Sequence, residues 1–216
     1  MKLVIKPDIN SFEHILETEI YKKLWKQNSR KILKAFRNVT GLDFQQRVIT
    51  ARIGNIEQSI SGSFHYPMRL RMLVAKPNDK LVLLIHELSH RLLGGNALGV
   101  VNLGIVSRKD NNSDEANEYD HRHIYLFEYD VIKLALGEDM GNACLKFEGK
   151  VSGTENINDN SHQKAWNWAM KMSFEERQIA VKRLSSKAIT RDKWSDTDIN
   201  IILTTPANWY EFLTAR

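Results

Sequence analysis

The stretch His86-Glu87-Leu88-Ser89-His90 constrains the fold of this chain more than any other feature of its sequence. No glycine or proline interrupts residues 80–93 around it, and an apolar run leads into it, so a helix is predicted. Pro77 suits the start of that helix, and Gly94-Gly95 suits its end. Residues four apart lie one above the other on a helix. The imidazoles of His86 and His90 are therefore expected side by side on one face.

This spacing predicts a metal site. Two neutral imidazoles can coordinate one ion, and zinc suits them because it accepts imidazole nitrogens in a tetrahedral shell. Glu87, beside the first histidine, is then the candidate general base toward a water molecule, as in a zinc-dependent hydrolase. With 7 histidines in 216 residues, the motif is expected by chance only about 0.014 times. The alternative is a buried helix whose histidines only form hydrogen bonds within the core.

Composition narrows the class of protein. At 216 residues, with 42% hydrophobic and 26% charged residues, the chain is typical of a globular protein with one core and an appended subdomain. The net charge of +5 is mild and the basic residues are spread out, which argues against a dedicated nucleic-acid binder. The single cysteine, Cys144, excludes a disulfide framework within the chain and a zinc site built mainly from cysteines. Because neither a secretory signal nor an apolar run of about 18 residues is found, we expect a cytoplasmic protein without membrane contact.

The hydrophobic pattern predicts both helices and strands, and thus an α+β fold. Strands are expected near 1–6, 46–53 and 69–74, and helices at 11–36 and at 120–136, where Gly137 ends the helix. The region 156–216 is predicted to be mainly helical, with a capping box that begins at Ser173.

The strand predicted at 69–74 directly precedes the motif helix. Its charged residues Arg69 and Arg71 fit the edge of a sheet. At such an edge a substrate peptide can pair as an added strand. An ordinary edge strand without a substrate role is the equal alternative.

A catalytic zinc usually has three protein ligands and one open position, so the second predicted helix, 120–136, is the place to look for a third ligand. On a helical wheel, His121 and Glu128 both fall on the apolar face of this helix, whereas His123 and Asp130 fall outside it. A carboxylate buried on that face needs a cation or a proton. The wheel therefore favours His121 or Glu128, ahead of His123, Glu118 and Asp130.

The block from Val82 to Leu93, followed by His121-Arg122 and residues 126–137, resembles small zincin-like metallopeptidases of bacteria and phages. The resemblance implies a minimal zincin-like core with an N-terminal helix, a small mixed or antiparallel sheet, the motif helix and a helix that carries the third ligand. We expect this core at 1–150 and a C-terminal, mainly helical extension packed on it at 151–216. In the pattern of these proteins the second helix opens with a histidine and a basic residue, and the position of Glu128 is apolar. The resemblance thus favours His121 over Glu128.

The resulting hypothesis is a zinc metallopeptidase that hydrolyses a peptide or protein substrate. His86, His90 and His121 hold Zn²⁺, with Glu128 as the alternative third ligand, and Glu87 carries the proton from the water to the leaving amine. The candidate oxyanion donors are Tyr125, Tyr129, Arg122 and His123. Two other functions stay open, a catalytically silent zincin scaffold that binds or regulates a partner and a hydrolase of non-peptide amides. A two-histidine motif also admits iron, manganese or nickel.

Overall fold

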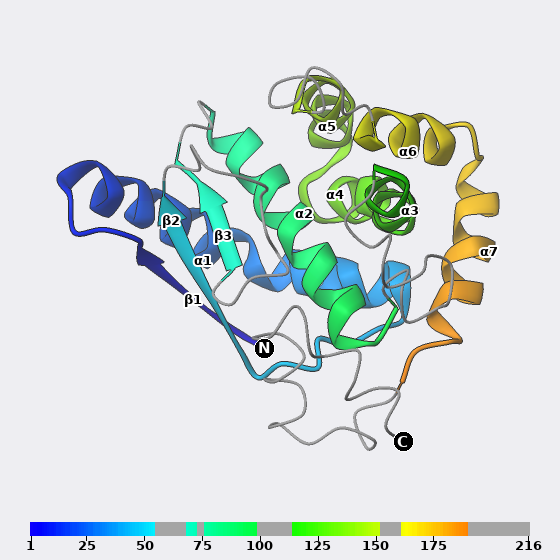
Figure 1. Ribbon diagram of the computed structural model, residues 1–216, viewed down its shortest axis with the longest axis horizontal. Coiled ribbons are helices and arrows are strands. Elements are labelled where there is room, and N and C mark those ends of the chain that lie inside the picture. Colours follow the sequence, from blue (N-terminus) through cyan, green and yellow to red (C-terminus); the bar gives the residue numbers. More distant parts are fainter. Residues whose placement is uncertain (55–67, 73–75, 99–113, 152–160, 190–216) are drawn as a thin grey trace. The chain divides into compact units, whose positions relative to one another are not determined.

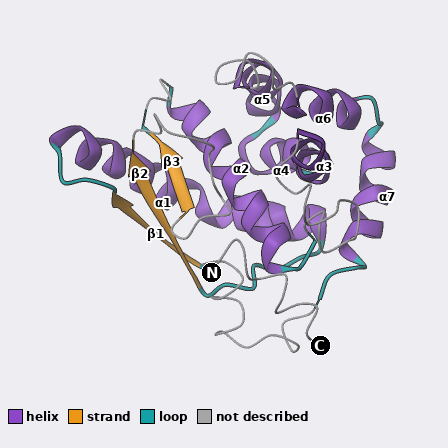
Figure 2. Ribbon diagram, in the orientation of Figure 1, coloured by secondary structure: helices purple, strands orange, loops and turns teal. Residues whose placement is uncertain are grey.

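The computed structural model describes residues 1–54, 68–72, 76–98, 114–151 and 161–189. These residues form a mixed α/β fold that is mostly helical, with one small sheet (Figure 2). The prediction that the chain combines helices with a small sheet is confirmed. The chain divides into two compact units. The first comprises the described parts of Met1–Arg30, Phe44–Asn96 and Ile189–Arg216, and the second comprises those of Lys31–Asp43 and Ala97–Ala188.

The sheet of the first unit consists of β1 (Lys2–Pro7), β2 (Val48–Gly54) and β3 (Met68–Arg71), in that order (Figure 1). Both pairs are parallel, with Leu3 opposite Ile49 and Ala51 opposite Met68. The expectation of a mixed or antiparallel sheet is therefore wrong for the described strands. The physical reason lies in the connection between β1 and β2, because the long helix α1 (Phe12–Thr40) returns the chain to the end of the sheet where β1 began.

The predicted edge strand is confirmed within the described sheet. The strand order puts β3 beside β2 alone, and Arg69 is exposed while its neighbours Met68 and Leu70 are fully buried. This alternation is the period of a strand with one buried face. Pairing of a substrate with β3 stays a prediction.

The motif helix forms as predicted. This helix, α2 (Pro77–Gly95), follows Lys76, whose extended backbone is the conformation that a residue before proline prefers. At the other end, Asn96 lies outside the helix. Its side-chain amide donates to the carbonyl of Leu92 at 2.8 Å, and its backbone N–H donates to that of Leu93 at 3.1 Å. All residues from Lys80 to Ser89 are buried, so α2 is a core helix on every side.

The second unit contains five further helices among the described residues. These are α3 (Asp114–Tyr125), α4 (Glu128–Leu136), α5 (Glu138–Val151), α6 (Ser161–Met170) and α7 (Phe174–Ser185). Helix α3 packs against α6, and α4 packs against α5. The capping box predicted at the start of α7 is confirmed, because the Ser173 hydroxyl accepts from the N–H of Glu176 and the Glu176 carboxylate accepts from the N–H of Ser173. Helix α5 was not anticipated.

The single helix predicted at 120–136 is wrong, because two helices meet there at Leu126 and Phe127. The N–H of Phe127 bonds to the carbonyl of Ile124, three residues back, at 3.1 Å, and the backbone of Phe127 leaves helical geometry at φ −129°. The buried ring of Phe127 contacts Phe36 edge to face, with ring centroids 6.3 Å apart. This core contact coincides with the break. The predicted end at Gly137 is confirmed.

Several expectations lie outside the described residues. They include residues 152–160 and 190–216 of the predicted C-terminal extension, so the division of the chain at 150 stays a prediction. Among the helices that the structure describes, none combines the length and the apolar character needed to traverse a bilayer.

Candidate metal centre

Helix α2 places the three motif residues as its spacing requires. The rings of His86 and His90 lie edge to face with centroids 5.0 Å apart. His86 is buried, His90 is half-buried, and the Glu87 carboxylate is buried with only 1% of the residue exposed. Ser89 is turned to its own helix, since its hydroxyl donates to the carbonyl of Ile85 at 2.9 Å. The first unit therefore offers two adjacent imidazoles and one buried carboxyl group.

A polar network of the first unit lies near Glu87. Lys80 on α2 is buried, and its ammonium donates to Glu17 of α1 at 2.5 Å while lying 5.4 Å from the centre of the Tyr21 ring. Burial raises the pKa of the Tyr21 phenol far above its usual range, and the negative charges of Glu17 and then Glu87 raise it further. The Tyr21 phenol therefore stays protonated, and the negative charge of Glu87 contributes to this effect.

His121 on α3 is buried and held in one orientation. Its Nδ1 lies 2.7 Å from the carbonyl oxygen of Asn117, one turn earlier on the same helix. A carbonyl only accepts hydrogen bonds, so Nδ1 carries the proton and Nε2 carries the lone pair. A metal-ligating histidine commonly donates its second ring N–H in this way. The tautomer of His121 is therefore the one that suits a ligand.

The structure brings His86, His90 and His121 together. Each offers one ring nitrogen, and these three atoms lie within 4.8 Å of one another. Within the described part of the chain, this is the group of metal-ligating side chains that meets such a spacing, and Glu128 does not belong to it. Three neutral imidazoles are a donor set that zinc accepts in catalytic sites, with a fourth position for water. The residues present thus fit a zinc ion.

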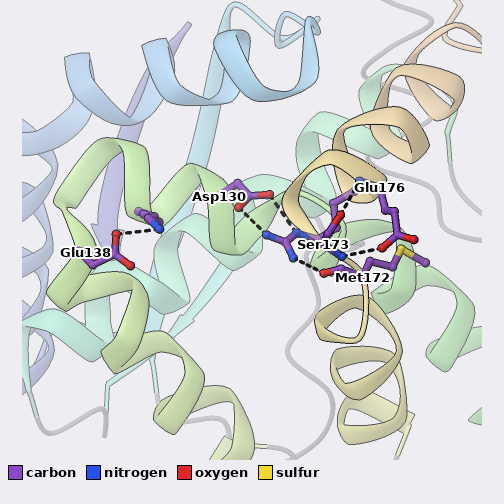
Figure 3. A network of polar contacts seen from close by, with 7 residues as sticks. Asp130, Glu138, Met172, Ser173 and Glu176 are labelled. Carbon is purple, nitrogen blue, oxygen red and sulfur yellow. Dashed lines mark hydrogen bonds and ion pairs between the residues drawn. The ribbon is translucent and has the colours of Figure 1, made fainter.

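Two of the other candidate ligands are engaged elsewhere in the second unit. Both carboxylate oxygens of Asp130 accept from Arg177, at 2.8 and 3.0 Å (Figure 3). Asp130 is buried, so its placement outside the apolar face by the wheel is wrong, because the wheel ran through the break at Phe127. Glu118 accepts from Arg122 at 2.6 Å.

Two candidate ligands remain, His123 and Glu128, and neither is a member of the histidine group. Burial lowers the pKa of His123 to about 4, against a smaller opposing effect of its hydrogen bond to the backbone of Leu98, and Lys187 lowers it further. Glu128 is fully buried, as predicted, but it begins α4 instead of lying in mid-helix.

Sequence reasoning missed the residues that surround His121. The ring of His162 on α6 lies 3.6 Å from that of His121, centroid to centroid. The Tyr125 hydroxyl lies 2.9 Å from Nδ1 of His162, and the ring of Tyr125 is fully buried. Forty-one positions separate His121 from His162, so no local spacing signals that they meet. Tyr125, a candidate oxyanion donor, is thus already bonded to a histidine.

Two further oxyanion candidates also have partners in the second unit. The guanidinium of Arg122 lies 4.8 Å from the ring centre of Tyr119 and 5.2 Å from that of Trp168, in addition to its bond with Glu118. The ring of Tyr129 lies 5.6 Å from the guanidinium of Arg177.

Comparison with known proteins finds no family model, curated protein or solved structure that matches this chain.

Proposed function

We propose that this protein is a zinc-dependent metallopeptidase of zincin type, in which His86, His90 and His121 hold the ion. The observation that carries the proposal is the approach of three imidazole nitrogens within 4.8 Å of one another. The buried carboxyl group of Glu87, next in sequence to His86, adds the base that a purely structural zinc site does not need. The resemblance of residues 70–140 to small metallopeptidases points to peptide bonds as the substrate.

The chemistry of the proposal divides between the ion and the chain. When bound, zinc lowers the pKa of a water ligand toward about 7 and polarises a carbonyl. The two histidines of α2 and His121 would hold the ion through neutral ring nitrogens, and the carbonyl of Asn117 keeps His121 in the required tautomer. Glu87 takes a proton from the attacking water and delivers it to the leaving amine. The buried position of Glu87 keeps bulk water from competing for that proton.

The first experiment separates metal binding from catalysis. Purified chain is assayed for bound metal by mass spectrometry and for cleavage of unfolded protein and peptide libraries. The Glu87→Gln variant should keep zinc and lose hydrolysis by orders of magnitude, because amide and carboxylate have the same shape but the amide is no base. Undiminished cleavage by this variant would overturn the role of Glu87.

The second experiment identifies the third ligand. His121→Ala should lose zinc, whereas Glu128→Ala should retain it, because Glu128 lies outside the histidine group. The reverse result would make Glu128 the ligand.

The other functions remain as outcomes of these tests. Zinc binding without cleavage by the wild type would favour a silent scaffold that binds or regulates a partner. Cleavage of small amides but not of peptides would favour a non-peptide hydrolase, and a different bound metal would replace zinc in the proposal. Cytoplasmic location is part of the proposal and is checked by cell fractionation.

A further inference from the structure

Helices α3 and α6 of the second unit share a cluster of polar side chains around His121. Three members lie four residues apart on one face of α3, and the other two are the first residues of α6. We name these five the α3–α6 polar cluster: Asn117, His121, Tyr125, Ser161 and His162.

Each member of this cluster contacts the next. Asn117 uses its backbone carbonyl for Nδ1 of His121, while its side-chain amide donates to the Ser161 hydroxyl at 2.6 Å. The ring of His162 lies over that of His121 at 3.6 Å, with a tilt of 43°. His162 is itself held by the Tyr125 hydroxyl at 2.9 Å. The ring of His121 is thus restrained at one edge by α3 and on one face by α6.

Tyr125 is the member of the cluster whose position is fixed by packing. It is fully buried, and its ring packs edge to face on Trp166, with centroids 5.0 Å apart. A buried aromatic ring loses little further freedom when its hydroxyl bonds a neighbour. The hydrogen bond between Tyr125 and His162 therefore fixes the position of His162, whose ring contacts the ring of His121.

We propose that His162 is a positioning residue for the metal ligand His121, fixed in turn by Tyr125. The inference rests on the proposed function, in which His121 binds zinc. The hydrogen bond at Nδ1 defines the tautomer of His121 and restrains one edge of its ring, but χ2 has broad minima that still permit a limited rotation of the ring. The His162 ring blocks that rotation and keeps Nε2 of His121 aimed in one direction. Outer groups that orient a ligand typically change metal affinity 10- to 100-fold.

The experiment measures the zinc dissociation constant of the full chain by competition with a chromophoric chelator. His162→Ala should weaken zinc binding about 10- to 100-fold. His162→Phe keeps an aromatic face against His121 and should recover part of this loss. Tyr125→Phe removes only the hydroxyl and should weaken binding by a smaller factor. If His162→Ala does not fold, Tyr125→Phe and His162→Phe carry the test.

A spectroscopic signature separates positioning from general destabilisation. Cobalt(II) replaces zinc, and its visible d–d bands report the geometry of the ligands. His162→Ala and Tyr125→Phe should shift or broaden these bands. The matched control is Trp168→Ala, which removes a contact between α6 and Arg122 of α3 outside the cluster. It should lower the melting temperature and leave zinc affinity and the cobalt spectrum unchanged.

The outcomes distinguish this inference from the proposed function. Wild-type zinc affinity and cobalt spectra in both His162→Ala and Tyr125→Phe overturn the role of His162 alone. Equal losses of affinity in Trp168→Ala and His162→Ala overturn it as well, because they would reflect stability. A wild type that binds no zinc, or whose binding survives His86→Ala, overturns the proposed function and this inference with it.

Discussion

Breaking the buried ion pair between Asp130 of α4 and Arg177 of α7 should destabilise the fold more than breaking an exposed ion pair among the described residues. Its side chains are only 4% and 7% exposed, and two hydrogen bonds join them at 2.8 and 3.0 Å (Figure 3). A third bond, at 2.9 Å, joins Arg177 to the carbonyl of Met172. Asp130→Asn keeps the shape of the side chain but leaves the guanidinium buried without its counter-charge. Loss of one partner of a buried pair costs about 3–5 kcal/mol.

This cost should appear as a lower melting temperature. For a chain of this size, 1 kcal/mol corresponds to roughly 2–4 °C, so a decrease of roughly 6–20 °C is expected. Hydrogen exchange followed by mass spectrometry localises the effect, because peptides from α4 and α7 should lose protection first. Zinc affinity should remain that of the wild type, since Asp130 is bonded to Arg177 and lies outside the histidine group.

The matched control is the exposed pair of Lys133 and Glu138, whose atoms lie 2.7 Å apart while the side chains are 44% and 58% exposed. Glu138→Gln should change the melting temperature far less, because solvent screens an exposed pair. Equal decreases in melting temperature in Asp130→Asn and Glu138→Gln would refute the argument that burial determines how much stability is lost when an ion pair is broken. A loss of zinc in Asp130→Asn without a loss of stability would instead make Asp130 a ligand.

Three further predictions concern local features. Ser173→Ala should lower the free energy of unfolding by about 1 kcal/mol in urea titrations, because the capping box of α7 is lost; an unchanged midpoint would contradict this. Gly137→Ala should cost about 1–3 kcal/mol by the same measurement, since its φ of 97° strains any residue with a Cβ; a neutral effect would contradict this. The pKa of Tyr21 is raised above its ordinary 10.0 by burial, so above pH 10 the unfolded chain releases a proton that the folded chain retains, and stability should fall by up to about 1.4 kcal/mol per pH unit. Tyr21→Phe should remove this component of the alkaline decline, and an identical pH profile would refute it.

Local sequence determined the parts of this protein that depend on neighbours along the chain. An apolar run without glycine or proline specified α2, and its residue before proline marked the start. The four-residue spacing put the rings of His86 and His90 beside each other, since helix geometry alone decides that contact. The capping box at Ser173 and the end at Gly137 are also local, and both were predicted.

Tertiary structure decided what depends on residues distant in sequence. β1 and β2 are parallel because α1 returns the chain to the end of the sheet where β1 began. The hydrophobic pattern of a strand does not contain this information. The interruption at Phe127, where its ring packs on Phe36, invalidated the helical wheel for Asp130. The partners of Asp130 and His121, namely Arg177 and His162, belong to later helices. Spacing predicts contacts only within one element, and contacts between elements arise when separate helices and strands bury their apolar faces together.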